Sequence, residues 1–284
     1  MTTSTTDLVQ QFTGFFDDAA TFPPGLAPLE EAVADHVARW AAPLAAAVGP
    51  AVLKLEDLPR ARRTASGLDL GGRAVEVSAV VPAGQLTAAL DLAEQIGPEL
   101  RIVSVELKTD PSDQEVWTAQ LREAAAVAGL PVYVELTAGQ VTSGALELLR
   151  GTGLRLKYRT GGIAAHLFPT PEQLAAVLVE AVAAGIPFKL TAGLHEAVRY
   201  TDPATGFTHH GFLNIAMATG AARAHEPVEH VARLLTETDP APLSRLARAS
   251  DGSWREFFTS FGTCSVGEPA ASLERLGLYP PGLA

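Results

Sequence analysis

Cysteine is almost absent from this chain of 284 residues, in which Cys264 is the single example. One cysteine cannot form an intrachain disulfide or a multi-cysteine metal site. A single cysteine therefore fits a protein of a reducing compartment.

Basic clusters and long apolar runs are also missing. The formal net charge is −11, and no face of clustered lysine and arginine is available for phosphates, so we expect no nucleic-acid partner. No run approaches the roughly 20 apolar residues of a membrane span, so we expect no membrane partner. The segment Met1–Asp7 has neither a basic start nor an apolar centre, which predicts that there is no signal peptide and that the protein is cytoplasmic.

Apolar residues make up 47% of the chain, which is enough for a large buried core. The 20 prolines are scattered along the chain and mark no linker. We therefore expect one domain over residues 1–284. The composition is compatible with a homo-oligomer as well as with a monomer.

Eight short apolar runs alternate with stretches that carry apolar residues at helical spacing. This alternation is typical of repeated βα units, and eight parallel strands are the number that closes a barrel of about 250 residues. The sequence therefore predicts an α/β fold, a single-domain (β/α)₈ TIM barrel. The predicted strands are Thr13–Asp17, Ala51–Leu55, Val75–Val81, Arg101–Lys108, Pro131–Leu136, Leu154–Arg159, Ile186–Thr191 and Phe257–Thr263.

One helix is clearly marked, and one long segment has no helical pattern. Apolar residues recur at helical spacing over Glu172–Ala184, and Thr170 followed by Pro171 predicts the start of this helix. The segment of about residues 196–224 has histidine and aromatic residues instead. We expect it to be a long functional loop after strand seven.

Side chains alternate between the two faces of a strand, so the apolar set of each strand identifies the residues that point into the barrel. Four neighbouring strands direct charge inward, mostly near their C-terminal ends, where barrel enzymes bind substrates. The alternatives are a purely structural salt-bridge network and a strand phase shifted by one residue. The expected inward charges are Glu106, Lys108, Glu135, Lys157, Arg159 and Lys189.

Two of these residues, Lys157 and Lys189, each precede a glycine by four positions, which predicts equal heights on adjacent strands. Parallel strands lie about 4.8 Å apart, so two ammonium groups at one level repel each other and lower the pKa of one lysine. A lysine with a lowered pKa is a nucleophile toward carbonyl carbon. The pair therefore predicts Schiff-base chemistry.

Three short segments resemble the class I, Schiff-base aldolases with a (β/α)₈ barrel, of which deoxyribose-phosphate aldolase is the nearest pattern. They are Lys157-Tyr-Arg-Thr-Gly-Gly162, Pro169-Thr-Pro-Glu-Gln173 and Phe188-Lys-Leu-Thr-Ala-Gly193, about forty residues of the chain. The resemblance implies that Lys157 forms the Schiff base and that Lys189 tunes it. Arg159 and the histidine-rich loop depart from the family pattern.

The remaining candidates surround the two lysines. Glu135 and Glu106 are proton-transfer candidates from their inward phase, and His195 is a third because imidazole transfers protons near neutral pH. Guanidinium groups and the backbone N–H groups of glycine turns bind anions, which suits an anionic substrate. The predicted substrate-binding residues are Arg159, Gly161, Gly162, Gly193, Arg199, His209 and His210.

These features predict a carbon–carbon lyase that acts on a small anionic carbonyl substrate through a lysine imine and needs no cofactor. One alternative is a barrel isomerase, decarboxylase or metal-assisted enzyme without a covalent step, with a metal held by Asp17 or Asp18 together with His209 or His210. The other is a non-catalytic barrel that binds a small ligand.

Overall fold

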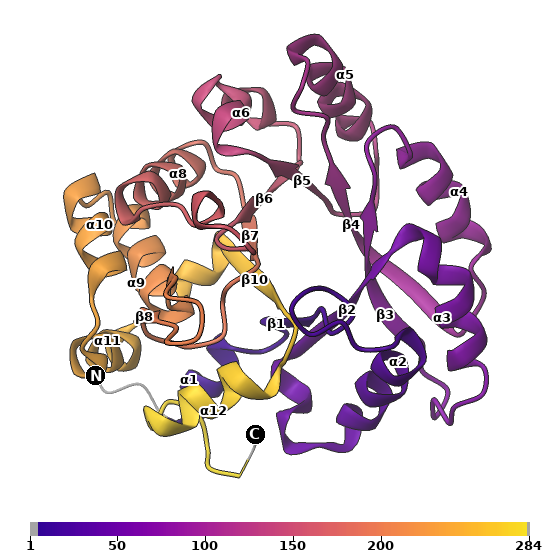
Figure 1. Ribbon diagram of the computed structural model, residues 1–284, viewed down its shortest axis with the longest axis horizontal. Coiled ribbons are helices and arrows are strands. Elements are labelled where there is room, and N and C mark those ends of the chain that lie inside the picture. Colours follow the sequence, from indigo (N-terminus) through magenta and orange to yellow (C-terminus); the bar gives the residue numbers. More distant parts are fainter. Residues whose placement is uncertain (1–4, 283–284) are drawn as a thin grey trace.

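The computed structural model describes residues 5–282, which form a closed barrel of eight parallel strands with helices around it (Figure 1). The order around the barrel is β1-β10-β7-β6-β5-β4-β3-β2, which confirms the (β/α)₈ architecture. Every barrel strand overlaps a predicted one, with bounds that agree to within three residues. The barrel strands are β1 (Phe16–Asp18), β2 (Val48–Lys54), β3 (Val75–Val81), β4 (Leu100–Lys108), β5 (Val132–Leu136), β6 (Arg155–Arg159), β7 (Phe188–Thr191) and β10 (Phe258–Thr263).

Helices occupy the connections between the strands and cover the outside of the barrel (Figure 1). Within residues 5–282, no helix has the length and apolar character needed to cross a membrane. The α-helices are α1 (Thr5–Gln11), α2 (Leu29–Ala38), α3 (Leu58–Ala65), α4 (Leu86–Gln95), α5 (Gln114–Ala125), α6 (Ala138–Thr142), α7 (Ala145–Leu149), α8 (Pro171–Ala183), α9 (Phe212–Arg223), α10 (Val228–Thr236), α11 (Pro240–Ala249) and α12 (Gly267–Arg275).

A cluster of aromatic rings closes the barrel where its first and last strands meet. Phe15 precedes β1, and its ring centroid lies 4.9 Å from that of Phe258 and 5.2 Å from that of Phe261 on β10. Phe16 packs against Phe212 of α9 at 5.8 Å. These rings are fully buried, and they fix the position of the next residue in the chain, Asp17.

The helix α8 begins where the sequence predicts. The hydroxyl of Thr170 accepts a hydrogen bond from the backbone N–H of Gln173, and the side-chain oxygen of Gln173 accepts one from the backbone N–H of Thr170. Pro171 lies in the first turn, where no backbone N–H is needed. This reciprocal capping box fixes the end of the connection that follows β6.

The connection after β7 is shorter than the loop expected over residues 196–224. It contains an antiparallel hairpin, β8 (Tyr200–Thr201) and β9 (Thr208–His209), and it ends at residue 211 because α9 begins at Phe212. Nine of the twelve residues of α9 are buried. A helix buried on all sides has no polar face, so the sequence shows no amphipathic pattern for it.

The capping box gives a test of the local structure. Replacing Thr170 with Ala removes one cap hydrogen bond, so we expect the free energy of unfolding to fall by about 1 kcal/mol. Chemical denaturation measures this change. The matched control is Thr118→Ala within α5, where removal of a β-branched side chain leaves stability unchanged or slightly higher. Equal stabilities for Thr170→Ala and the wild type would contradict the cap.

Candidate active site

Three inward-facing residues lie at one level on adjacent strands. Glu135 of β5 pairs in register with Lys157 of β6, and Lys157 pairs with Lys189 of β7. The neighbours Leu156 and Leu190 lie in the apolar layer between the strands and the helices. The predicted strand phases and the equal heights of the two lysines are therefore confirmed.

Lys157 lies between two carboxylates. Its Nζ atom is 2.8 Å from Oε2 of Glu106 on β4 and 2.8 Å from Oε2 of Glu135. Both predicted acidic residues thus contact the lysine that the resemblance marks as the nucleophile. Two carboxylates at this distance can accept a proton from the ammonium group.

Lys189 is slightly more buried and also has two carboxylate partners. Its Nζ atom is 2.5 Å from Oδ2 of Asp17 on β1, and it forms a second ion pair with Glu106. Ser260 of β10 donates a hydrogen bond to Asp17, and Ser78 of β3 donates one to Glu106. The barrel therefore encloses an unbroken chain of alternating charges, Glu135–Lys157–Glu106–Lys189–Asp17, which we call the lysine–carboxylate chain.

The carboxylates reverse the expected pKa shift of the lysines. Burial lowers the pKa of Lys157, but the charges of Glu106 and Glu135 outweigh burial and raise it. Burial also opposes the charged form of Lys189, and the charges of Asp17 and Glu106 again raise the pKa. The prediction that repulsion between the ammonium groups lowers one pKa is therefore wrong, because a carboxylate lies between them.

The acidic members of the chain respond in different ways. Burial favours the neutral form of Glu106, yet the two lysine charges lower its pKa to about 2. The pKa of Glu135 is also lowered, against its burial, by Lys157 and Arg159. Burial raises the pKa of Asp17 above its usual range in spite of Lys189. Asp17 is thus the carboxyl group of the chain that most readily holds a proton.

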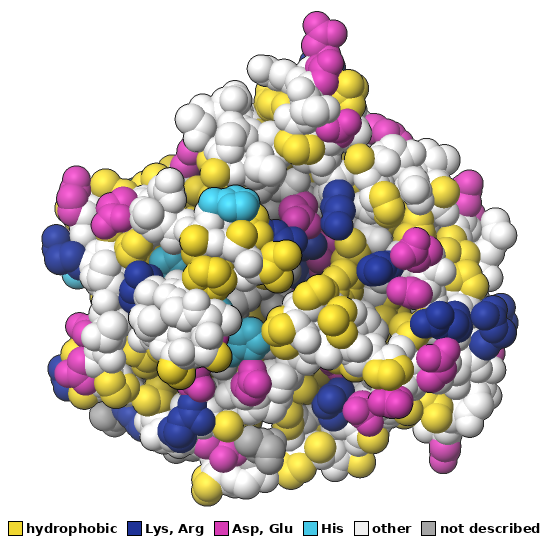
Figure 2. Space-filling model, in the orientation of Figure 1, with side chains coloured by type: hydrophobic (Ala, Val, Ile, Leu, Met, Phe, Trp, Pro, Cys, Tyr) yellow, Lys and Arg dark blue, Asp and Glu magenta, His cyan; other side chains and the backbone are white. Residues whose placement is uncertain are grey.

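Side-chain exposure rises from Lys189 through Lys157 and Glu135 to Arg159, which lies two residues beyond Lys157 on β6. The side chain of Lys189 is 2% exposed, that of Lys157 5%, that of Glu135 17% and that of Arg159 40%. A nitrogen of Arg159 lies 3.3 Å from Oε1 of Glu135, so the arginine joins the chain at its open end. Figure 2 shows acidic and basic side chains gathered in the central hollow of this face. Arg159 and Glu135 are therefore the members of this site that solvent reaches most easily.

The hairpin after β7 packs against the connection that follows β6. The ring of His209 stacks on Tyr200, and its Nδ1 atom lies 2.9 Å from the carbonyl oxygen of Gly193. Phe207 and Phe168 are in ring contact at 5.1 Å between centroids. The segment therefore lies beside the barrel mouth rather than extending into solvent.

The predicted histidine and arginine residues outside the barrel strands do not contact the two lysines directly. They are His195, Arg199, His209 and His210. His210 is 1% exposed, its Nε2 atom lies 2.8 Å from the carbonyl oxygen of Pro169, and burial lowers its pKa to about 4. Arg199 contacts His210, with 3.4 Å between the nitrogens. These two residues secure the base of the hairpin. His195 lies 2.6 Å from a carboxylate oxygen of Glu268, a pair that can transfer a proton at the rim.

The predicted glycine turns allow two connections to touch. A Cβ atom at Gly161 would lie 3.0 Å from the Cα atom of Gly193, so neither residue can carry a side chain without displacing the other turn. Gly193 also has a φ of +82°, in the region that favours glycine. A Cβ atom at Gly162 would meet Leu167. The glycines position the rim of the site, and their role in binding an anion stays a prediction.

Asp17 is the residue that sequence reasoning did not assign to the lysines. The sequence offers Asp17 as an alternative to Asp18 for a metal site with His209 or His210, but the Asp17 side chain contacts Lys189. Asp18 points outward, where it contacts His36 at 3.0 Å and Arg39 at 2.7 Å. Among the described residues, no three His, Cys, Asp or Glu side chains form a group suited to a metal ion. The alternation of Phe16, Asp17 and Asp18 along β1 was the signal that could have placed Asp17 inside.

Fold and site together define a (β/α)₈ barrel with a buried lysine–carboxylate chain that opens at the C-terminal ends of its strands. No protein-family model matches this chain, and no curated protein matches its sequence. The chemistry proposed below therefore rests on the residues of this chain.

Glu106 provides a test of the buried chain. Because Glu106→Gln leaves two buried ammonium groups with one carboxylate each, we expect the free energy of unfolding at neutral pH to fall by about 3–5 kcal/mol. The wild-type carboxyl has its pKa lowered from 4.5 to about 2. Its stabilising contribution is therefore complete above pH 4.5 and is lost as the pH falls toward 2.

Urea unfolding between pH 7 and pH 3 measures both effects. We expect the variant Glu106→Gln to lose less of its stability than the wild type as the pH falls from 4.5 to 3. Glu94→Gln on the exposed surface of α4 is the control, and its stability curve should follow that of the wild type. Parallel curves for Glu106→Gln and the wild type would show that Glu106 does not carry the ion pairs.

Proposed function

We propose that this protein is a carbon–carbon lyase that binds a small anionic carbonyl substrate as an imine on Lys157. The observation that carries the proposal is the place of Lys157 between two carboxylates, one of which, Glu135, is the more exposed end of the buried charge chain. Such a lysine has a proton acceptor on each side. The resemblance of its strand and turn to class I aldolases supports the same assignment.

The two lysines differ in what they can reach. Lys189 is enclosed by Asp17 and Glu106, and its Nζ atom lies 5.3 Å from the ring centroid of Tyr133. No substrate carbon can approach this nitrogen without displacing a buried partner. Lys157 is therefore the nucleophile of the proposed reaction, and Lys189 keeps Glu106 ionised.

Lys157 must lose its proton before it can attack a carbonyl group. Arg159 stabilises the ionised form of Glu135 in the free protein. An anionic group of the substrate would draw the guanidinium group away from Glu135, which raises the pKa of Glu135 and allows it to accept the proton of Lys157. Substrate binding thus activates the lysine, and the raised pKa of Lys157 belongs to the resting state.

The proposed reaction then proceeds through imine formation, carbon–carbon cleavage, and a final protonation and hydrolysis of the enamine that releases the second product and frees Lys157. The nitrogen of Lys157 bonds to the carbonyl carbon, and the carbonyl oxygen takes up protons and leaves as water, which gives an iminium ion. The bond between the α and β carbons then breaks, and its electron pair moves toward the iminium to form an enamine. The β-hydroxyl group loses its proton to a carboxylate, and the β carbon leaves as the carbonyl carbon of the first product. Glu135 and Glu106 are the carboxylates within reach of Lys157, and His195 is a candidate at the rim.

Reductive trapping tests the imine. The protein is incubated with a panel of small hydroxy-aldehydes, keto acids and sugar phosphates, reduced with borohydride, and analysed by mass spectrometry. We expect one stable adduct on Lys157, because the reduced imine cannot hydrolyse. Lys157→Met should abolish the adduct, and Lys189→Met should shift its formation to higher pH, since Glu106 then acts on Lys157 alone.

Lys54 is the matched control because its side chain is half exposed outside the lysine–carboxylate chain. Lys54→Met should leave trapping unchanged. A substrate that is turned over without any trapped species, at a rate that survives Lys157→Met, would contradict the imine. An adduct that forms on Lys189 in the Lys157→Met variant would show that Lys189, and not Lys157, is the nucleophile.

Arg159 provides a separate test of the anionic substrate. Arg159→Gln removes the exposed cation at the open end of the lysine–carboxylate chain. We therefore expect KM to rise about tenfold or more for a carbonyl substrate that carries a carboxylate or phosphate. Initial-rate kinetics measure the change. Arg122→Gln on the exposed side of α5 should leave KM unchanged. A KM that is equally insensitive to both changes would exclude Arg159 as the anion-binding group.

One observation favours a second candidate function. Both lysines have raised pKa values in the free protein, which suits ammonium groups that hold an anionic ligand without forming a bond to it. The protein would then be a ligand-binding barrel or an enzyme without a covalent step. Lys157→Arg separates the two candidates, because it keeps a cation for binding and removes the nucleophile. Unchanged ligand affinity and turnover in Lys157→Arg, together with no trapped adduct in the wild type, would favour this second candidate.

A further inference from the structure

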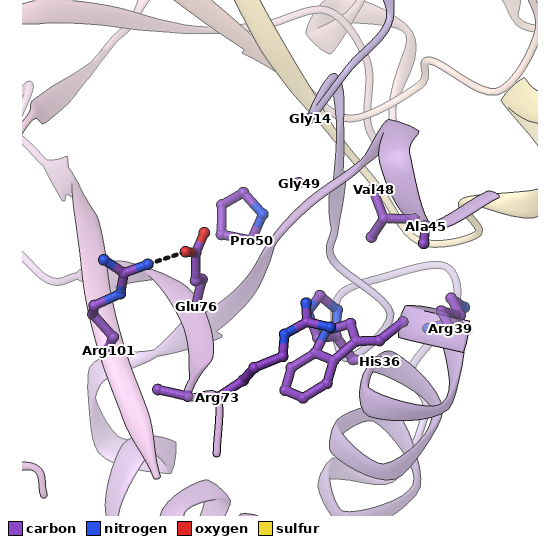
Figure 3. Close-up of a pocket in the computed structure, with 12 residues that line it drawn as sticks. Gly14, His36, Arg39, Ala45, Val48, Gly49, Pro50, Arg73, Glu76 and Arg101 are labelled. Carbon is purple, nitrogen blue, oxygen red and sulfur yellow. Dashed lines mark hydrogen bonds and ion pairs between the residues drawn. The ribbon is translucent and has the colours of Figure 1, made fainter. Parts of the chain in front are cut away.

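A second cavity lies at the opposite, N-terminal end of the barrel (Figure 3). Its walls come from the first residues of β2, β3 and β4, from the end of α2 and from the turn η1 (Arg39–Ala41) that follows α2. The cavity has a volume of about 540 Å³, within the range of small-molecule sites, about 300–1,000 Å³. No member of the lysine–carboxylate chain lines it.

The walls of this cavity are positively charged in a protein whose net charge is −11. Arg39, Arg73 and Arg101 line it, and Glu76 is its single acidic lining residue. Arg101 is paired with Glu76, a contact that Figure 3 shows on the side of Pro50. One wall of the cavity is therefore already arranged around a carboxylate.

Arg73 is the arginine whose donors are available. Its guanidinium carbon lies over the ring of Trp40, 4.0 Å from the ring centroid. Within residues 5–282, no carboxylate lies within ion-pair distance of Arg73. A stacked guanidinium keeps its N–H edge free, and that edge matches an oxyanion in two-point geometry.

A buried histidine completes the polar wall. His36 is 4% exposed, and its Nδ1 atom lies 3.0 Å from Oδ2 of Asp18, which also accepts a hydrogen bond from Arg39. These contacts fix the orientation of the imidazole ring and leave its Nε2 atom without a partner among the described side chains and backbone groups. A group oriented in this way is pre-organised to contact a ligand.

We propose that this cavity binds a small organic oxyanion, a phosphate monoester or a carboxylate, whose charged end lies on Arg73 and Arg101. The apolar side chains of Trp40, Val48 and Pro50 offer surface for an uncharged body, and the volume is larger than a bare phosphate requires. The charged end is common to both ligand types, and the experiment below separates them. The site is independent of the proposed lyase reaction, because it lies at the other end of the barrel.

The cavity nevertheless shares a wall with the lysine–carboxylate chain. Gly49 lines the cavity, and a Cβ atom at this position would overlap Oδ1 of Asp17. That oxygen is buried and has no hydrogen-bond partner among the described residues. The backbone of Gly49 therefore separates the two sites, and a glycine is required there.

Calorimetric titration of the full chain at low ionic strength tests the proposal, with phenyl phosphate, benzoate and inorganic phosphate as probes. We expect one saturable site. At least one of the two organic anions, phenyl phosphate or benzoate, should bind to it more tightly than inorganic phosphate does. Arg73→Gln should weaken that binding about tenfold or more, since it removes a charge-assisted two-point contact. Arg101→Gln should weaken it as well. Arg122→Gln on α5 is the control and should bind like the wild type.

Tryptophan fluorescence gives a second readout that locates the ligand. Trp117 and Trp254 are 3% and 1% exposed, so Trp40 is the tryptophan that a ligand in the cavity can affect. The emission change on titration should disappear in Trp40→Phe. The melting temperature of each variant, measured without ligand, shows that it is folded.

Two further variants separate this site from the barrel mouth. Binding should be retained in Arg159→Gln and in Lys157→Met if the anion occupies the N-terminal cavity. Loss of binding in Arg159→Gln with retention in Arg73→Gln would place the anion at the mouth and overturn the proposal. Equal affinities of Arg73→Gln and the wild type, or the absence of saturable heat with all three probes, would overturn it too.

Discussion

The buried ion pairs of the lysine–carboxylate chain are the constraint on which the rest of this structure depends. A charged group removed from water costs several kcal/mol unless it is paired and hydrogen-bonded, and this barrel buries two lysines and two carboxylates almost completely. The arrangement is stable because each inner charge has an opposite charge on both sides. Ser78 and Ser260 supply hydrogen bonds to the carboxylates. Any mutation that breaks the alternation leaves an uncompensated charge in a closed space.

The ion pairs and the closed barrel require each other. Asp17 and Lys189 are 172 positions apart in the sequence, and they meet because β1 and β7 both pair with β10. The aromatic cluster around Phe15 holds β1 against β10, so the packing of apolar rings sets the position of a charged oxygen. Closure of the barrel is thus the event that completes the site.

Much of this arrangement was predictable from local patterns. Alternating apolar residues fixed the phase of β4 to β7, so Glu106, Glu135, Lys157 and Lys189 could be assigned to the barrel interior. The capping box at Thr170 and the pairing level of the two lysines also depend on residues close in sequence. Periodicity, capping residues and spacing over a few positions indicate these features.

The features that sequence reasoning missed depend on contacts between distant residues. The pKa shift of the lysines was predicted in the wrong direction, because the position of Glu106 between them requires β4 in its folded place. The helix α9 was hidden because burial on all sides erases the amphipathic pattern. The N-terminal cavity is lined by arginines from three separate segments, and no sequence motif indicates it.

Glu106 faces both ammonium groups, and this shared contact limits how the site can titrate. When one lysine gives up its proton, the full charge of Glu106 acts on the lysine that is still protonated, and the second proton becomes harder to remove. The two lysines therefore titrate as a pair, with one proton released well before the other. A barrel with two buried lysines of nearly equal height has, for this reason, only one amine available for bond formation at any time.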